Sequence, residues 1–496
     1  MSLLQNVTFI ARQYCGRRCS SIRSPLSAHR ATLKPMPTTY QRRWITEVIG
    51  TPSISNEASS ISLKDGNPAT VKESSRDNTE VQKSIGSMDW SQYHPAILRD
   101  ACRCARCVDP FSGQKNFQTT DIPENLEIAS TEIMPDGSAI FRWSDDIAGW
   151  DESHATSLPA DLIERLRHIS KAQDYHSHAQ PRAYWDADRI RKSLIYVNYG
   201  DYMNNEDALY LMLTAMNRQG LVILRGVPNL EGAVEKIAMR IGTIRDTFYG
   251  HTWDVKSKPE AKNVAYTSQF LGLHMDLLYM AKPPGVQFLH CLKNTCEGGT
   301  SLFTDSWKAA AQDLSAADRN LLSTFELPYH YENAGEHYYF RHPVVELGSS
   351  TGSLGPRDRK HVTIRHVNYS PPFQDIQHPI TDDLSNNKKL FQQRMAALRN
   401  FAAALESENN LFEYKLQEGE CVIFNNRRVL HGRRQFSTAG GERWLKGTYI
   451  DTDAIMSRCR VLEANPAVAK GKKHRTLVHE YGGNVFSSIT ADSSAD

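Results

Sequence analysis

A His-x-Asp triplet and a second histidine far along the chain are the features that most constrain this sequence. His274 and Asp276 are flanked by apolar residues, which predicts a core strand on which positions i and i+2 share one face. His431 follows the strand predicted at Glu420–Phe424 and precedes a glycine, so we expect it at a strand end. Two histidines and one carboxylate form the facial ligand set of non-haem Fe(II) oxygenases. The chain must then bring two distant strands together in one β-rich core.

An arginine downstream adds to this pattern. Arg443 follows His431 closely in the sequence. A guanidinium can bind a carboxylate through two parallel hydrogen bonds, which suits the distal carboxylate of 2-oxoglutarate. The alternative for any single histidine is a surface position or a satisfied core position. The combination of triplet, distal histidine and arginine favours an iron site.

A cysteine cluster predicts a second metal site. Cys102, Cys104 and Cys107 have the spacing C-x-C-x2-C, and His154 is the candidate fourth ligand. Three thiolates and one imidazole suit a tetrahedral zinc ion, and a site with four protein ligands is structural. Short strands are predicted between the cysteines and the histidine, including residues 138–143. The alternative is a set of ordinary thiols. The odd number of cysteines, nine, and the lack of a secretory signal argue against a disulfide framework.

The first part of the chain differs in charge from the rest. No acidic residue precedes Glu47, whereas eight basic residues do: Arg12, Arg17, Arg18, Arg23, Arg30, Lys34, Arg42 and Arg43. This composition predicts a mitochondrial transit peptide over residues 1–46 and a location in the matrix. The alternatives are a basic disordered tail and a cytoplasmic protein. Residues 47–87 are rich in small polar side chains and are expected to form a disordered linker.

The remaining sequence is long enough for two domains. We expect a zinc-binding domain over 88–180, a catalytic domain over 181–485 and a disordered tail over 486–496. Helices are predicted at Asp207–Gln219 and Leu384–Ser407, and strands at Leu221–Leu224 and Val367–Pro372. The formal net charge of +2 argues against nucleic-acid binding, and no segment is apolar enough for a membrane span. A homodimer stays an open alternative.

Several separate motifs resemble one enzyme family. They are Asp246–Trp253, Asn263–Thr267, His274–Asp276, Pro283–Lys293, Gly298–Gly299, Val429–Arg434 and Met456–Leu462. Together they resemble the gamma-butyrobetaine dioxygenase and trimethyllysine dioxygenase family, which belongs to the taurine dioxygenase-like Fe(II)/2-oxoglutarate oxygenases. The resemblance covers about residues 95 to 465. It implies a mainly β catalytic domain with flanking helices, a double-stranded β-helix or jelly roll, preceded by a small β-rich zinc-binding domain.

The resemblance also implies roles for individual residues. The implied iron ligands are His274, Asp276 and His431, and Arg443 is the implied 2-oxoglutarate-binding residue. The implied substrate-binding residues are an aromatic cage for a trimethylammonium group and one polar residue: Tyr249, Trp253, Tyr266, Tyr449 and Asn263. The implied zinc ligands are Cys102, Cys104, Cys107 and His154. A quaternary ammonium has no N–H donor, so aromatic faces suit it, although core packing is the alternative for any single ring.

The activity that the resemblance implies is hydroxylation of gamma-butyrobetaine to L-carnitine, in carnitine biosynthesis. It would need Fe(II), 2-oxoglutarate, O2 and a structural zinc ion, with ascorbate as the reductant. N6-trimethyllysine is the alternative substrate, which the predicted presequence favours, whereas the local motifs favour gamma-butyrobetaine. An alternative of another class is a non-catalytic protein that binds quaternary ammonium compounds on the same fold. The expected partner is in each case a small quaternary ammonium compound.

The sequence departs from the family pattern in three places. Met275 replaces the usual threonine within the triplet and is expected to face away from the metal. Asn425 stands where an aspartate is common, which is expected to change hydrogen bonding around the iron ligands. Ser370 and Pro371 replace a polar pair that contributes to substrate carboxylate binding in relatives. The last change concerns the anionic end of the substrate.

Overall fold

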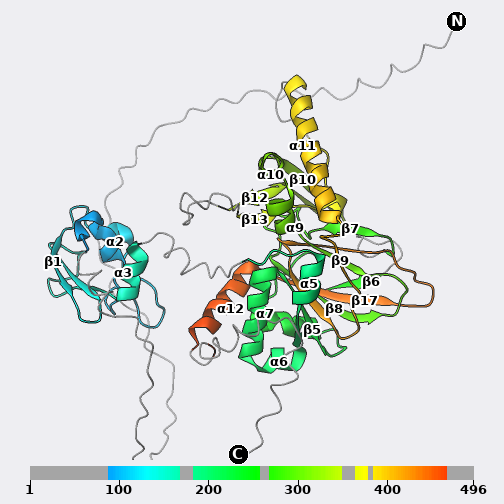
Figure 1. Cartoon of the computed structure of the whole chain (residues 1–496). Helices are drawn as coiled ribbons and strands as arrows, with labels where there is room; N and C mark the ends of the chain where they lie inside the picture. Colours follow the sequence, from blue (N-terminus) through cyan, green and yellow to red (C-terminus); the bar gives the residue numbers. More distant parts are fainter. Residues whose placement is uncertain are drawn as a thin grey trace, which may run out of the picture. The chain divides into compact units, whose positions relative to one another are not determined.

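The computed structural model describes residues 88–167, 182–256, 267–348, 363–377, 384–465 and 468 (Figure 1). The predicted transit peptide, linker and C-terminal tail lie outside these residues, so the three assignments stay predictions. Within the described ranges, no helix is both long enough and apolar enough to span a membrane.

The N-terminal unit, residues 88–167, is a small sheet with short helices. Its three strands form an antiparallel sheet in the order β1-β2-β3. Gly137, which has a positive φ, lies in the turn between β1 and β2. Leu98, Phe141 and Leu158 form a buried core on this sheet. The elements are the 3-10 helices η1 (Trp90–Gln92) and η2 (Thr119–Asp121), the helices α2 (Pro95–Asp100) and α3 (Ala160–Arg167), and the strands β1 (Ile128–Ile133), β2 (Ala139–Trp143) and β3 (Thr156–Leu158).

Two sheets dominate the part of the chain that begins at residue 182. A six-stranded sheet has the order β4-β5-β15-β8-β17-β6, and a four-stranded sheet has the order β14-β9-β16-β7. All neighbours in them are antiparallel except β4 and β5. This pair of sheets is the jelly roll expected from the sequence. The strands are β4 (Ile195–Asn198), β5 (Leu221–Arg225), β6 (Trp253–Lys256), β7 (Leu271–His274), β8 (Val286–Asn294), β9 (Ser301–Asp305), β14 (Phe412–Tyr414), β15 (Cys421–Asn425), β16 (Val429–Arg433) and β17 (Arg443–Ile450).

Two shorter ribbons accompany the main sheets. β10 (Glu326–Asn333) pairs with β11 (Glu336–Pro343), and β12 (Val345–Leu347) pairs with β13 (Ile364–Val367). The predicted strand Val367–Pro372 is therefore wrong beyond its first residue. The two prolines cannot donate ladder hydrogen bonds, and the chain instead forms the 3-10 helix η5 (Pro371–Phe373).

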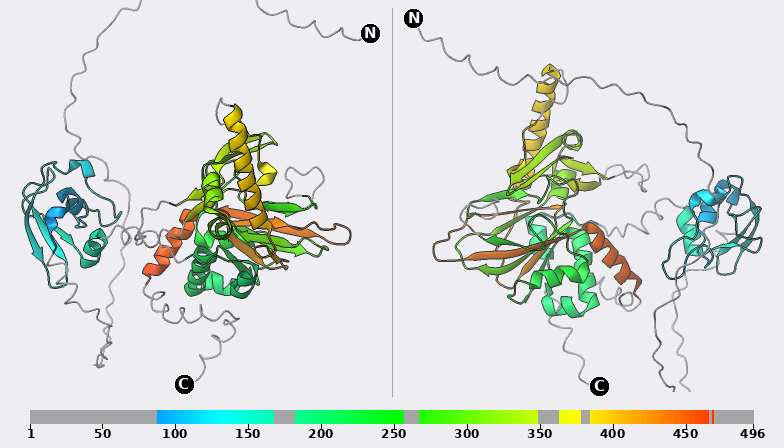
Figure 2. Two further views of the ribbon diagram at one scale, coloured as in Figure 1. Left: turned by 45° about the horizontal axis from the view of Figure 1, so that its top comes forward. Right: turned by 180° about the vertical axis from the view of Figure 1, so that it is seen from behind.

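Helices pack on both sides of these strands (Figures 1 and 2). The predicted helix at Asp207–Gln219 is α7, and it ends at Gly220, whose φ of 76° permits the left-handed cap. The long helix α11 (yellow in Figure 2) begins at Leu384, as predicted, and its buried Phe401 and Leu405 join the core beside the four-stranded sheet. The helices are α5 (Ala187–Ser193), α6 (Tyr199–Asn204), α7 (Glu206–Gln219), α8 (Ala233–Ile241), α9 (Ser306–Lys308), the π-helical turn η4 (Ala309–Asp313), α10 (Ala316–Ser323), α11 (Leu384–Glu406) and α12 (Thr452–Ala464).

Candidate functional site

The predicted iron ligands meet where β7 and β16 pair. His274 and His431 are direct cross-strand partners, and their ring centroids lie 4.2 Å apart. The Nε2 atoms of these two histidines lie 3.4 Å and 3.9 Å from Oδ1 of Asp276. One ligand atom from each residue lies within 4.8 Å of the others, so the three side chains can share one metal ion.

The local geometry differs from the sequence-based prediction in two respects. β7 ends at His274, and Asp276 lies in the following turn, where Leu277 has a φ of 64°. His431 lies in the middle of β16, where its neighbour Gly432 lets the backbone of β7 approach closely. The triad therefore combines two paired strand residues with one turn residue, and a continuous strand over the triplet was the wrong prediction.

A buried asparagine holds this turn in place. Asn426 accepts a hydrogen bond from the backbone N–H of Asp276 at 2.9 Å and donates to its carbonyl oxygen at 3.1 Å. The same amide donates to the carbonyl of Pro284 at 3.1 Å. Asn426 is fully buried, so its hydrogen bonds fix the backbone that presents the Asp276 carboxylate. The sequence analysis did not identify this residue.

The ionisation states of the triad suit metal binding. Burial, followed by the proximity of His274, lowers the pKa of His431 to about 3, so its ring is neutral near neutral pH. Burial opposes the charge on Asp276, but its contact with His274 and the nearby ring of His431 hold its pKa well below the usual range. His274 Nδ1 lies 2.9 Å from the carbonyl oxygen of Gly272 and donates to it in the tautomer that leaves Nε2 free. Neutral imidazoles and a carboxylate are the forms that coordinate divalent iron.

Tyr449 contacts the same carboxylate. Its hydroxyl donates to Asp276 Oδ2 at 2.5 Å. Burial and the charge on Asp276 raise the pKa of Tyr449 well above its ordinary value, so the phenol keeps its proton. Trp253 stacks on this ring, with centroids 4.1 Å apart and planes inclined by 26°.

The indole of Trp253 has its place because β17 carries a glycine opposite it. Gly447 pairs with Trp253 in the β17–β6 register. A Cβ at Gly447 would lie 2.6 Å from the indole carbons, which is too close for any side chain. Trp253 and Tyr449 thus form one continuous aromatic surface in the pocket.

The rest of the predicted cage divides into two groups. Tyr249 lines the same pocket, and its hydroxyl lies 3.3 Å from that of Tyr279. Tyr266 and Asn263 lie outside the described residues, so their roles stay predictions. Three of the four predicted cage residues, Tyr249, Trp253 and Tyr449, therefore line one cavity.

Further aromatic residues at this cavity were not predicted. Tyr279 and Phe373 line it, and their ring centroids are 5.4 Å apart. Phe373 is the last residue of η5, which begins directly after Ser370, one of the residues that depart from the family pattern. Ser370 itself is buried, and its hydroxyl has no hydrogen-bond partner within the described ranges. An aromatic side chain thus faces the pocket from the segment that carries a polar pair in the family pattern.

The two departures near the iron ligands have local structural explanations. Met275 is fully buried in the core, as expected for a side chain facing away from the metal. Asn425 Oδ1 accepts from the backbone N–H of Arg427 at 2.9 Å, so it stabilises the turn between β15 and β16. That turn leads directly into the strand of His431.

Arg443 is the first residue of β17, the strand that carries Tyr449 near its other end, and it is buried. The residue is 6% exposed, and its Nε has no hydrogen-bond partner in the part of the chain that the structure describes. Among the described residues, no carboxylate forms an ion pair with it, whereas Phe436 lies below its guanidinium at 5.8 Å. A buried guanidinium without an anion is costly, and a bound carboxylate would satisfy it. The arginine therefore fits the predicted contact with 2-oxoglutarate.

The pocket lies between the two sheets. Most lining residues of β8, β9 and β17 alternate, as side chains that share one face of a strand must, whereas Gly432 of β16 and both Leu271 and His274 of β7 also border the pocket. The six-stranded sheet contributes Gln287 and Leu289 from β8 and Arg443, Leu445 and Tyr449 from β17, and the four-stranded sheet contributes Ser301 and Phe303 from β9 and His431 and Arg433 from β16. The iron triad, Arg443 and the aromatic rings thus line one pocket.

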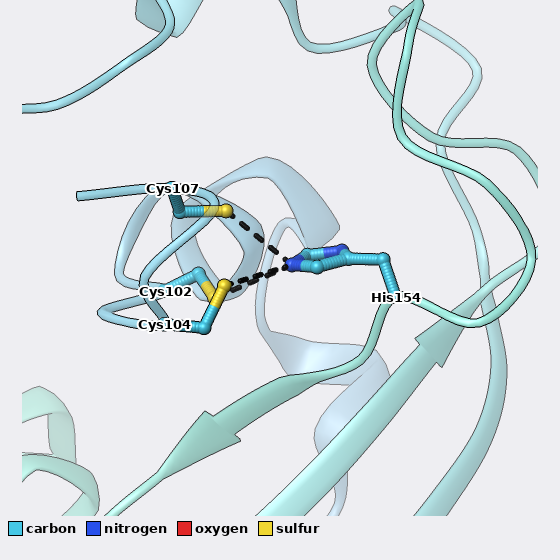
Figure 3. Close-up of side chains that lie close together, drawn as sticks. All are labelled: Cys102, Cys104, Cys107 and His154. Carbon is cyan, nitrogen blue, oxygen red and sulfur yellow. Dashed lines mark hydrogen bonds between the residues drawn. The ribbon is translucent and has the colours of Figure 1, made fainter. Parts of the chain in front are cut away.

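The four predicted zinc ligands also come together (Figure 3). The Sγ atoms of Cys102, Cys104 and Cys107 lie 3.6, 3.5 and 3.3 Å from Nε2 of His154. A tetrahedral zinc ion with ordinary bond lengths places sulfur and nitrogen ligands about 3.6 Å apart. The donor set and its spacing therefore fit a closed, structural zinc site.

Two residues behind the cysteine cluster were not predicted. Asp146 Oδ2 lies 2.7 Å from His154 Nδ1, which orients Nε2 toward the three thiols. Arg99 is fully buried and links this carboxylate to the cysteines, because it donates to Asp146 at 2.6 Å and to Cys107 Sγ at 3.3 Å. Carboxylate, imidazole and thiol are thus joined into one network.

Comparisons with known proteins agree with this geometry. Residues 178–449 match the family model described as taurine catabolism dioxygenase TauD, TfdA family, and residues 74–158 match gamma-butyrobetaine hydroxylase-like, N-terminal. The chain is 36% identical over 387 residues to dioxygenase str8 of Strobilurus tenacellus, covering 74% of this chain and 84% of the relative. It is 33% identical over 388 residues to the gamma-butyrobetaine dioxygenase of Pseudomonas sp. (strain AK-1), covering 75% of this chain and 91% of the relative. It is 28% identical over 369 residues to the mitochondrial trimethyllysine dioxygenase of Rattus norvegicus, covering 74% and 81%.

Proposed function

The chain belongs to the taurine catabolism dioxygenase family TauD/TfdA and is a 2-oxoglutarate-dependent dioxygenase, and from this premise we propose that it hydroxylates a trimethylammonium compound. The preferred substrate in this proposal is gamma-butyrobetaine. The observation that carries the proposal is the stacked pair Trp253 and Tyr449, whose rings border the same pocket as the triad. Aromatic faces attract a quaternary ammonium through the ring quadrupole, by about 0.5–2 kcal/mol per ring.

Fe(II), 2-oxoglutarate and O2, when bound, supply an oxidative decarboxylation that yields succinate and CO2 and places one oxygen atom on a substrate C–H bond. His274, Asp276 and His431 would hold the iron, and Arg443 would hold the distal carboxylate of 2-oxoglutarate. The protein's own contribution is position: the rings fix the cationic end, so that one carbon of the substrate faces the metal.

Tyr449 has two roles in this proposal. Its face belongs to the cage, while its hydroxyl donates to the Asp276 carboxylate. The hydrogen bond fixes the ring relative to the iron ligand, so that the distance between the bound ammonium group and the metal is set by one side chain. The mostly apolar and aromatic lining keeps water away from the reacting carbon.

The two candidate substrates differ at the end opposite the trimethylammonium group. Phe373 faces the pocket from the η5 segment, and Asn263 lies outside the described residues. N6-trimethyllysine is therefore kept as the alternative substrate, and it is supported by the similarity to trimethyllysine dioxygenases. We propose the mitochondrial matrix as the location, on the basis of the basic N-terminal composition alone.

A substrate comparison tests the proposal. Purified protein with Fe(II), ascorbate, 2-oxoglutarate and O2 is given gamma-butyrobetaine, N6-trimethyllysine, butyltrimethylammonium or unmethylated gamma-aminobutyrate, and succinate and hydroxylated product are measured. We expect the greatest turnover with gamma-butyrobetaine and none with gamma-aminobutyrate. Turnover of butyltrimethylammonium equal to that of gamma-butyrobetaine would show that the carboxylate is not recognised. Background succinate with every methylated compound would contradict the proposed substrate class.

A further inference from the structure

A cluster of potential metal ligands lies on the β10–β11 hairpin, apart from both predicted metal sites. His330 and Glu332 are two residues apart on β10, so they share one face, and His337 is the direct cross-strand partner of Glu332. One ligand atom from each lies within 4.8 Å of the others. We propose that this hairpin binds one divalent transition-metal ion of the zinc class through His330, Glu332 and His337.

The distances suit such an ion. His330 Nε2 lies 3.1 Å from His337 Nε2 and 3.7 Å from Glu332 Oε2. Two nitrogen ligands of a tetrahedral zinc ion lie about 3.3 Å apart when each bond has its ordinary length of about 2.05 Å. The two imidazole nitrogens therefore already have the separation that a shared ion requires. Two imidazoles and a carboxylate match the preferences of zinc and its neighbours, with water as the fourth ligand.

The hairpin holds these ligands on a well-defined backbone. Its loop consists of Ala334 and Gly335, both with positive φ, which is the turn that matches the twist of two antiparallel strands. Glu332 and His337 are the second pair from this loop. The nearest cation on the same face of β11, Arg341, is already paired with Glu326. An ion at the site would join both strands close to the turn.

The opposite face of the hairpin packs toward the substrate pocket. Tyr331 and Tyr338 alternate with the three ligands and each lie 5.0 Å from the ring of Phe248. Tyr331 also stacks on Tyr279, which lines the pocket, at 5.2 Å. A bound ion would therefore stabilise the hairpin whose inner face supports the pocket wall, without itself entering the catalytic site.

Zinc titration of the full-length protein tests the site. The protein is loaded with Fe(II) and 2-oxoglutarate in the absence of oxygen, and its N-terminal zinc content is confirmed before ZnCl2 is added. Bound zinc and released iron are both counted after gel filtration. The test variants are His337→Gln and Glu332→Gln. Glu336→Gln is the matched control, because it removes one carboxylate from the same hairpin on the other face.

We expect the wild type and Glu336→Gln to bind one additional zinc ion per chain with affinities within twofold of each other. Each test variant should bind this ion at least tenfold more weakly, without iron release. The inference is overturned when the wild type binds no additional zinc, when zinc uptake equals iron release, or when both test variants keep wild-type affinity. His337 and Glu332 are exposed, and if either variant fails to fold, the other decides the question. Catalytic turnover is not measured, so the outcome is independent of the proposed substrate.

Discussion

Two buried arginines of the jelly roll, Arg428 and Arg443, should respond to the same substitution in opposite ways. Arg428 donates to both carboxylate oxygens of Asp305, at 3.0 and 2.7 Å, and both side chains are almost completely buried. Arg443 is also buried but has no such partner among the described residues. If Arg443 exists to bind 2-oxoglutarate, its replacement by methionine should not weaken the ligand-free fold.

The magnitudes follow from these contacts. Arg428→Met leaves the Asp305 carboxylate buried without a counter-charge, which should cost about 3–5 kcal/mol of the free energy of unfolding. Arg443→Met removes an unsatisfied group, whose burial costs about 1–3 kcal/mol, so stability should stay equal or increase. The same variant should weaken 2-oxoglutarate binding at least about 30-fold, because a buried charge pair is worth about 2 kcal/mol or more.

Urea unfolding without 2-oxoglutarate measures the first effect. Calorimetric titration of the Fe(II)-loaded protein with 2-oxoglutarate, in the absence of oxygen, measures the second effect. An Arg443→Met variant that loses as much stability as Arg428→Met would show that Arg443 serves the fold. Retention of wild-type affinity for 2-oxoglutarate would equally refute the assigned role.

Three further predictions concern the cage, the core and the N-terminal site. Gly447→Ala should displace the indole of Trp253 and raise the KM for the trimethylammonium substrate far more than the KM for 2-oxoglutarate. The control is Gly232→Ala, whose added methyl group meets no atom within 4 Å and which should change neither KM. His290 is fully buried, its ring nitrogens have no hydrogen-bond partner among the described residues, and burial lowers its pKa to about 4. Protonation therefore favours the unfolded state as the pH falls from 6.5 toward 4, and the free energy of unfolding decreases. In urea titrations across that range, His290→Met should remove about 3 kcal/mol of this decrease. Elemental analysis of Cys104→Ser should show loss of one zinc ion per chain, and unchanged zinc content would refute that site.

The sequence predicted the members of the candidate sites better than the way in which they are held. His274, Asp276 and His431 were identifiable because metal ligands are restricted to few residue types and their spacing follows strand periodicity. The continuous strand over the triplet was wrong, because apolar flanks do not distinguish a strand from a buried turn. The turn depends on Asn426, a residue distant in sequence whose amide contacts Asp276.

The supporting residues share this reason for being missed. Asp146 orients His154, yet the residues beside it in the sequence give no sign that this aspartate differs from one on the surface. Phe373 reaches the pocket because two prolines end a predicted strand and begin a 3-10 helix. Hydrogen-bond partners and pocket walls are chosen by tertiary contacts, whereas metal ligands and helix caps carry local signals, as Gly220 does at the end of α7.

Labelling with 18O2 tests the central claim most directly. The protein is incubated with Fe(II), 2-oxoglutarate and gamma-butyrobetaine under 18O2. The 18O content of the succinate and of the hydroxylated product is then measured by mass spectrometry. We expect one 18O atom in succinate, one in the product, and neither compound with a His274→Ala variant. A hydroxylated product whose new oxygen comes from water, or equal turnover by His274→Ala, would contradict the assignment of this pocket as an iron and 2-oxoglutarate site.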